Sequence, residues 1–363
     1  GHFYPLVAVA RALRDIAEEE RIVSMDIIMM GAKPFDPDAL LEDNIQYEEI
    51  PAGKIRRYFS ISNFSDSIKT ARGIIRAIRK ITLHPPDVVF SKGGYDSFPV
   101  LVAARLYRIP VMIHESDAIP GVVNKWAGRF ARRIGVSFPE TVHAFPQEKV
   151  ALIGNPIRPG IIGGSHDEAF DMFDLESGIP TVLVLGGSLG AQKINDAVIS
   201  LLPELVEKAQ VIHSTGKDNF ESVKGEADVS MGESVHKKRY HPFSLLNQSQ
   251  LRNASFIADV VVSRAGAGAI FEIAAWNVPA ILVPITDSAQ NHQRENAYNY
   301  ARAGAAEVVE EANLTPHLLE AEILKIVGDA SRKNDMKAAA KTFARVDAAR
   351  KIASELIRLG LHE

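Results

Sequence analysis

The chain has 363 residues, of which 46% are hydrophobic, with a formal net charge of −4 and no cysteine. This composition indicates a globular protein long enough for two domain-sized cores. It excludes disulfides and cysteine-ligated metal sites, and the charge gives no sign of nucleic-acid binding. No uncharged apolar stretch approaches the roughly 18–20 residues that span a bilayer.

The first segment, "GHFYPLVAVARALRD", has apolar residues at helical spacing from Leu6 to Leu13. A doubly wound domain normally begins with a strand and a glycine-rich turn, so we expect the first strand to be missing here. His2 precedes the predicted helix, where the local field keeps an imidazole neutral and able to act as a base near pH 7. A lone histidine is more often structural, and both interpretations stay open.

A basic segment follows between residues 54 and 80, where eight basic residues accompany one acid. Apolar residues recur among them at helical spacing. Such a helix can lie on an anionic membrane or pack its apolar face on its own domain, and the segment alone allows both. The basic residues are Lys54, Arg56, Arg57, Lys69, Arg72, Arg76, Arg79 and Lys80, and the apolar ones are Ile68, Ala71, Ile74, Ile75, Ile78 and Ile81.

Short runs rich in valine and isoleucine alternate with amphipathic helices along the chain. They are predicted to be buried parallel strands, and their alternation with helices is typical of a doubly wound α/β architecture. The runs lie at 25–32, 87–94, 110–116, 181–188, 210–216, 259–266 and 280–286.

One pattern occurs twice, starting at Asp87 and at Asp259: strand, glycine-containing turn, helix, proline, strand. The repetition predicts two Rossmann-like domains, with ligands in a cleft at the carboxyl edges of both sheets. The stretch 155–166, rich in proline and glycine, suits a linker. We expect an N-terminal domain at 1–158 and a C-terminal domain at 159–344. The last helix, 345–363, could close either domain, and we expect it to pack back on the first.

A glycine-rich turn follows the run at 181–188. Gly186, Gly187 and Gly190 let the backbone approach a ligand, and the next helix offers free N–H groups to a nucleotide diphosphate. Ser188 adds a hydroxyl. The turn has neither a Walker A lysine nor dinucleotide spacing, and a turn that binds nothing remains the alternative.

Two further segments suit a nucleotide sugar. In "SRAGAGAIFEIAAW", Glu272 either binds ribose hydroxyls or complements the helix dipole. The segment 287–296 either binds sugar hydroxyls through its amides or is a plain polar loop. Its polar residues are Asp287, Gln290, Asn291, His292, Gln293 and Asn296. His114, Glu115 and Asp117 end a strand without metal-ligand spacing.

Taken in order, "GHFYPLVAVARAL", "SKGGYDSFP", "HESDAIPGVVNKW", "GNPIR", "GGSLGAQKIN", "SRAGAGAIFEIAAW" and "NHQRENA" span nearly the whole chain. This succession resembles the MurG-type peptidoglycan N-acetylglucosaminyltransferases of glycosyltransferase family 28. The resemblance implies the GT-B fold and inverting transfer of GlcNAc from UDP-GlcNAc to lipid I (undecaprenyl-diphospho-MurNAc-pentapeptide). It implies no cofactor, no metal and no nucleic acid. It also implies a peripheral location on the anionic cytoplasmic face of the cell membrane, which favours the membrane interpretation of the basic segment.

The resemblance also implies roles for individual residues. His2 is the base, and Gly1, Gly93, Gly94 and Tyr95 belong to the acceptor side. Phe243 corresponds to an aromatic residue of the uracil pocket and Glu272 to the ribose ligand. Asp117 stands where the family often has asparagine, and Ala269 where many relatives have threonine. The donor set is Asp117, Arg158, Ser188, Phe243, Ser244, Ala267, Gly268, Ala269, Ile270, Phe271, Glu272, His292, Gln293 and Asn296.

Three alternatives remain at this point. A related UDP-sugar transferase for another lipid, such as diacylglycerol, would share the C-terminal half and differ in the N-terminal half. A UDP-GlcNAc epimerase would share the architecture and form its product without an acceptor. A binding module would keep the nucleotide-sugar pocket without turnover, which the presence of His2 disfavours.

Overall fold

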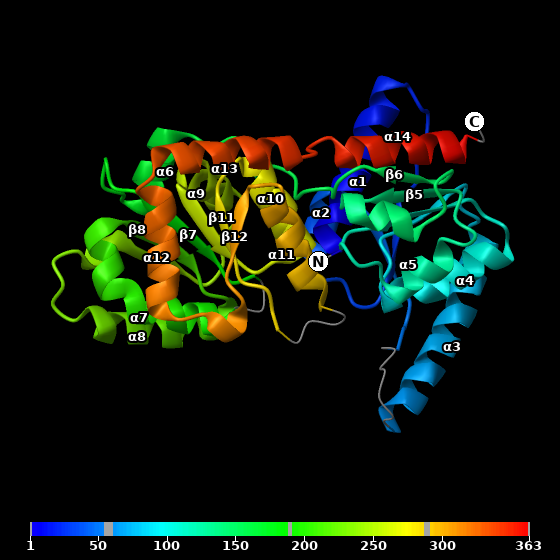
Figure 1. Ribbon diagram of the computed structural model, residues 1–363. Coiled ribbons are helices and arrows are strands. Elements are labelled where there is room, and N and C mark those ends of the chain that lie inside the picture. The colour runs from blue at the N-terminus through cyan, green and yellow to red at the C-terminus, as the bar shows by residue number, and fades with distance from the viewer. Residues whose placement is uncertain (1, 54–60, 188–190, 287–290, 362–363) are drawn as a thin grey trace. The chain divides into compact units, whose positions relative to one another are not determined.

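The chain forms two compact units in a computed structural model that describes residues 2–53, 61–187, 191–286 and 291–361, the side chains of 61–65 excepted. Unit 1 comprises Gly1–Arg158 together with Arg345–Glu363, and unit 2 comprises Pro159–Ala344 (Figure 1). Both units alternate strands with helices, so the predicted doubly wound α/β class is confirmed.

Unit 1 contains two parallel sheets among its described residues. A pair, β1–β2, stands apart from a sheet with the order β3-β4-β5-β6. The strands are β1 Ile28–Gly31, β2 Gln46–Glu49, β3 Val89–Ser91, β4 Val111–Glu115, β5 Arg133–Val136 and β6 Val150–Leu152. Strand β4 is buried along its whole length, which places its carboxyl end in the interior of the unit.

The C-terminal helix α14 (Ala348–Gly360) packs along α1 (Phe3–Glu19). Ile352 and Leu356 of α14 share a buried cluster with Val9 of α1 and Met112 of β4. The end of the chain is therefore part of the core of unit 1. The remaining helices of this unit are α2 Pro37–Glu42, α3 Ile61–Leu83, α4 Phe98–Leu106 and α5 Val122–Ala127, with the 3-10 turns η1 Tyr95–Ser97 and η2 Pro139–Ala144.

Unit 2 is built on one parallel sheet with the order β12-β11-β10-β7-β8-β9. Numbered within the unit, this is the Rossmann order 3-2-1-4-5-6, which reverses direction between β7 and β10. The strands are β7 Thr181–Leu185, β8 Gln210–Ser214, β9 Tyr240–Phe243, β10 Val260–Ser263, β11 Ala280–Leu282 and β12 Ala306–Val308.

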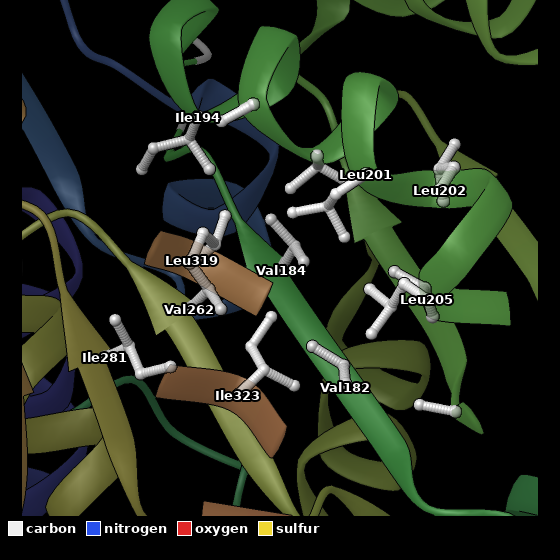
Figure 2. Packing of buried hydrophobic residues seen from close by; sticks show 14 of the residues in the cluster. Val182, Val184, Ile194, Leu201, Leu202, Leu205, Val262, Ile281, Leu319 and Ile323 are labelled. Carbon is white, nitrogen blue, oxygen red and sulfur yellow. The ribbon is translucent and has the colours of Figure 1, made fainter. Parts of the chain in front are cut away.

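Helices cover both faces of this sheet. Helix α7 packs its apolar stripe on one face beside α12, and Figure 2 shows Leu201, Leu202 and Leu205 of α7 near Val182 and Val184 of β7. The helices are α6 His166–Phe173, α7 Gln192–Lys208, α8 Phe220–Met231, α9 Gln248–Ile257, α10 Ala267–Trp276, α11 His292–Arg302, α12 Pro316–Val327 and α13 Ala330–Phe343, with the 3-10 turns η3 Lys217–Asn219, η4 Lys237–Arg239 and η6 Glu311–Asn313.

Every run predicted to be a strand contains one, and all pair in parallel. The prediction that all of these strands are buried is wrong in part, because β1 is only half-buried. Strands β2, β5, β6, β9 and β12 were not predicted. They are short and several carry polar or charged residues, so their extended form depends on pairing with a neighbour rather than on a hydrophobic run.

Helix α3 does not present the predicted apolar stripe as one face. Gly73, Ala77 and Ile81 form its buried side, where it contacts α4, whereas Ile68 and Ile75 are 48% and 67% exposed. Figure 1 shows that the N-terminal end of α3 projects from unit 1. Lys54, Arg56 and Arg57 lie outside the described residues. Among those that are described, no helix is long and apolar enough to cross a bilayer.

Candidate active site

At the carboxyl edge of the unit 2 sheet, glycines follow both strands, β7 and β10, at which the strand order reverses. Gly187 follows β7 with φ of +74°, a backbone conformation that favours glycine, and Gly266 and Gly268 follow β10. A Cβ atom added at any of these three glycines would meet no atom of the described residues within 4 Å. Helix α10 begins at Ala267, and the first N–H groups of a helix lack partners within it. An anionic group therefore has space and hydrogen-bond donors at this edge.

Helix α10 turns only some of the predicted donor residues outward. Ile270 and Phe271 are 0% and 2% exposed, and Phe271 packs against Phe343 with ring centroids 5.2 Å apart. Their side chains belong to the core, so only their backbone can face a ligand. Ala267 is buried too, while Ala269 and Glu272 are half-buried.

Helix α11 is tied to the turn after β10 by a buried amide. The Nδ2 of Asn296 donates to the carbonyl of Ala265 at 3.3 Å, and Asn296 has no exposed surface. This side chain braces the turn rather than meeting solvent. The Oε1 of Gln293 accepts from the backbone N–H of Ile285 at 3.2 Å, and the buried Nδ1 of His292 has no hydrogen-bond partner among the described residues.

An ion pair that the sequence did not reveal also holds this edge. The Nη2 of Arg264, directly after β10, donates to Glu311 Oε1 at 2.5 Å, and its Nη1 donates to the carbonyl of Val283. The other oxygen of Glu311 accepts from the hydroxyl of Thr286. Burial raises the pKa of Glu311, but Arg264 and Thr286 lower it further, so the carboxylate stays charged. In the sequence, the available signal for this ion pair was Arg264, a charged residue directly after a hydrophobic run.

The proposed uracil aromatic lies at the end of β9. Phe243 is half-buried and makes an edge-on contact with Phe173, with ring centroids 5.5 Å apart. The carbonyl of Ser244 accepts from the backbone N–H of Gly216 at 3.0 Å. These contacts fix the loop beyond β9 against the end of β8.

In unit 1, His2 lies against the turn that follows β3. Gly93 and Gly94 have φ of +79° and +84°, and a Cβ atom on Gly94 would lie 3.5 Å from the Nδ1 of His2. Burial, followed by the positive charge of Lys92, lowers the pKa of His2 to about 4, while Asp117 acts in the opposite direction. The imidazole is therefore neutral at pH 7, for reasons beyond the helix field expected from the sequence.

Behind this turn lies a buried group of polar side chains that the sequence analysis did not bring together. Lys92 is 3% exposed, and its Nζ lies 2.8 Å from His114 Nδ1 and 2.8 Å from Asn155 Oδ1. His114 is fully buried, and burial places its pKa well below the usual value. A lysine that ends an otherwise apolar run was the only signal in the sequence.

Glu115 organises the loop after β4. Its carboxylate accepts from the backbone N–H groups of Asp117 at 3.1 Å and Gly121 at 2.9 Å, and from the Nδ2 of Asn124 at 2.9 Å. Asn124 in turn fills the space beside Gly93, where a Cβ atom would lie 2.6 Å from its Nδ2. The turn after β3, which was predicted to lie on the acceptor side, and the loop bearing Asp117 are thus held by the same carboxylate and amide.

Two other predicted residues lie close in sequence or space to the start of α1 and to the turn after β3. The guanidinium of Arg158 lies over the ring of Tyr4, 4.5 Å from its centroid. Tyr95 opens η1, and burial raises the pKa of its hydroxyl. Among the described residues, no group of three or more histidine, aspartate or glutamate side chains is placed to hold a metal ion. The predicted Gly1, Ser188, Gly190, Asp287 and Gln290 lie outside the described residues.

Two Rossmann-like units with parallel sheets define a protein of the GT-B fold. The family models match in the same order along the chain: the glycosyltransferase family 28 N-terminal domain at residues 1–136 and the C-terminal domain of that family at 181–352. The chain belongs to glycosyltransferase family 28.

Its relatives carry a more specific name, UDP-N-acetylglucosamine–N-acetylmuramyl-(pentapeptide) pyrophosphoryl-undecaprenol N-acetylglucosamine transferase. One from Geobacillus kaustophilus is 38% identical over 94% of this chain and 92% of its own length. Another, from Bacillus thuringiensis, is 35% identical over 92% of this chain and 90% of its own.

Solved structures share the fold. The crystal structure of Acinetobacter baumannii MurG matches with a TM-score of 0.75 and 24% identity, over 99% of this chain and 96% of that one. The UDP-GlcNAc 2-epimerase of Neisseria meningitidis matches with a TM-score of 0.67 and 12% identity, over 98% and 97% of the two chains.

Proposed function

We propose that this chain transfers GlcNAc, with inversion, from UDP-GlcNAc to the 4-hydroxyl of MurNAc in undecaprenyl-diphospho-MurNAc-pentapeptide, a step of peptidoglycan biosynthesis. The observation that carries the proposal is 38% identity over 94% of the chain to a relative whose name states this transfer. The epimerases share the fold at 12–13% identity, which supports the architecture and no particular activity.

A transfer assay tests this proposal. The chain is incubated with labelled UDP-GlcNAc and a lipid I analogue, and we expect a GlcNAc–MurNAc disaccharide product that depends on both substrates. Formation of an epimer without any acceptor would replace the proposal by the epimerase alternative. Transfer to diacylglycerol but not to the lipid I analogue would replace it by the alternative lipid acceptor.

Unit 2 is the donor-binding unit in this proposal. The diphosphate of UDP-GlcNAc takes the carboxyl edge between β7 and β10, where backbone N–H groups and the start of α10 stabilise negative charge. Charge on the diphosphate increases as the glycosidic bond breaks, so donors already fixed in place stabilise the transition state. The buried amide of Asn296 and the Arg264–Glu311 pair keep the turn after β10 in position.

Unit 1 supplies the base. His2 is neutral, and it takes the proton of the 4-hydroxyl while the hydroxyl oxygen attacks the anomeric carbon and UDP leaves. The neighbouring Gly94 lets the acceptor approach beside the ring, where a Cβ atom would lie 3.5 Å from His2 Nδ1, whereas Asn124 fills the corresponding space at Gly93. The turn after β3 thus combines close approach with a proton acceptor.

Replacing Glu272 by alanine is expected to weaken UDP binding by about 1–3 kcal/mol, because the ribose hydroxyls lose a charged hydrogen-bond partner. Isothermal titration of the full chain with UDP and with 2′,3′-dideoxy-UDP measures this. The wild type should discriminate between the two ligands, and the variant should not.

Glu204→Ala on α7, an exposed glutamate, serves as the matched control and should leave UDP binding unchanged. A variant at Glu272 that still discriminates against the dideoxy ligand would show that the ribose has another partner. Equal binding of UDP and ADP to the wild type would contradict a uridine donor.

The membrane-facing surface in this proposal lies on α3 and the end of α4. Exposed apolar side chains, Ile68, Ile75, Leu83 and Leu106, lie beside basic ones on these packed helices. The exposed basic side chains on this part of α3 are Lys69, Arg72, Arg76 and Arg79. Apolar area and clustered positive charge together favour an anionic bilayer surface, and each basic residue near it contributes about 1 kcal/mol.

Changing Arg72, Arg76 and Arg79 to glutamate should weaken sedimentation of the protein with anionic vesicles and slow turnover of a long-chain acceptor. Turnover of a short, soluble acceptor should stay close to that of the wild type. A control variant changes three other exposed basic residues of unit 1 to glutamate and so alters the net charge equally. These residues are Lys33, Lys351 and Arg358. If both triple variants bind vesicles equally well at low salt, α3 does not face the membrane.

A further inference from the structure

Lys92 occupies a costly position for a lysine. It directly follows β3 at 3% exposure, and the two hydrogen-bond partners of its side chain, His114 and Asn155, are both uncharged. Burying an ammonium group without an opposite charge in contact costs several kcal/mol, and an apolar side chain at such a position is often better tolerated. The fold therefore gains nothing obvious from the charge, which points to a role outside packing.

The hydrogen bonds show that Lys92 is the donor to both partners. The Nε2 of His114 lies 2.8 Å from the carbonyl oxygen of Gly154, which can only accept, so Nε2 carries the ring proton. The Nδ1 of the neutral ring then accepts from Lys92. Asn155 Oδ1 accepts from Lys92 and from the hydroxyl of Ser116 at 3.2 Å. Neither partner carries a charge of its own, and the carboxylates that favour the charged lysine, Glu115 and Asp117, do so from outside these two hydrogen bonds.

We propose that Lys92 is a positioning residue that keeps the imidazole of His2 unprotonated, through the positive charge that His114 and Asn155 hold in the buried group behind the turn after β3. His2 lies over Gly94, next but one to Lys92 along the chain. The inference rests on the proposed function, in which His2 is the base.

The charged and titratable groups around the pair determine the sign of the effect. Burial, then Lys92 and then the terminal ammonium group lower the pKa of His2 to about 4, against Asp117 and a hydrogen bond with the backbone of Gly93, while His114 is neutral. Burial lowers the pKa of Lys92 to about 7, opposed by Glu115 and Asp117. Lys92 is thus charged below pH 7, the range in which an ordinary histidine would gain its proton.

The proton occupancy of His2 tests this directly and without substrate. We would titrate the full chain with ring-labelled histidine by NMR and assign the signal of His2 by its loss in His2→Gln. In Lys92→Met, the midpoint of His2 should rise by about 1 pH unit or more, because a nearby like charge is removed. The acidic limb of kcat/KM should move to higher pH by the same amount. Lys92→Arg, which keeps the charge, should restore a low midpoint.

Lys351→Met is the matched control, an exposed lysine of unit 1 paired with Asp347, and should leave the His2 midpoint unchanged. The wild type offers a measurement that needs no stable variant. The titration of one group changes the signal of a second group that interacts with it. The ring signal of His2 should therefore show a small second step near pH 7, where Lys92 loses its proton.

The outcomes separate the inference from the proposed function. An unmoved His2 midpoint in Lys92→Met overturns the inference, and so does the lack of a second step in the wild type. A shifted midpoint with an unmoved kcat/KM profile supports the influence of Lys92 on the ring and instead overturns the assignment of His2 as the base.

Discussion

Replacing His2 by alanine is expected to lower kcat for transfer to a lipid I analogue by about 10²–10⁴-fold, the usual contribution of a general base. The ring is neutral at working pH because burial and Lys92 lower its pKa to about 4. It lies against Gly94, in the turn assigned to the acceptor. Steady-state kinetics at saturating donor and acceptor measures the loss.

The same substitution should leave the melting temperature nearly unchanged. His2 is the N-cap of α1, yet its side chain makes no capping hydrogen bond, so alanine removes no helix contact of that kind. Titration with UDP should also be unaffected, since the donor site is assigned to unit 2. An unchanged kcat would reassign the base, and Asp117 would be the next candidate.

Replacing Leu202 by alanine is expected to destabilise unit 2 by about 2–5 kcal/mol, the cost of a cavity in a close-packed core. Leu202 has no exposed surface and lies in the cluster that α7 forms against the sheet (Figure 2). Two separate units need not unfold together, so a signal from unit 2 alone is required.

The two tryptophans make this measurement possible, because Trp126 lies in unit 1 and Trp276 in unit 2. In a Trp126→Phe background, urea unfolding followed by fluorescence should show the loss, and in a Trp276→Phe background it should not. Val229→Ala on α8, where the valine is 82% exposed, is the control and should cost little. A loss below about 1 kcal/mol for Leu202→Ala would show that the core closes around the smaller side chain.

The sequence by itself determined the architecture and the location of the glycine turns. The hydrophobic runs at β7, β10 and β11 are nearly continuous because these strands are buried on both faces, so the sequence pattern alone reveals them. Gly93, Gly94 and Gly187 have positive φ, a backbone conformation that glycine adopts most readily, so the glycines in the sequence indicate where these turns lie. The order of the motifs along the chain was sufficient to indicate the family.

Tertiary structure decided which strands exist beyond these and which faces of the helices are buried. The four residues of β2, Gln46–Glu49, become a strand by pairing with β1, a contact that no local pattern encodes. In α3, packing on α4 buries the side marked by Gly73 and leaves Ile75 outside. The spacing of apolar residues could not tell these sides apart.

The buried polar contacts of the site also needed the fold. Lys92 and Asn155 are 63 positions apart, and Arg264 and Glu311 are 47 apart, yet each pair meets at the carboxyl edge of a sheet. A parallel sheet brings the ends of distant strands to one edge, whereas local sequence reports only neighbours along the chain. The residue types near the site were therefore readable in sequence, but the charge that acts on His2 became evident only once those strand ends lay side by side.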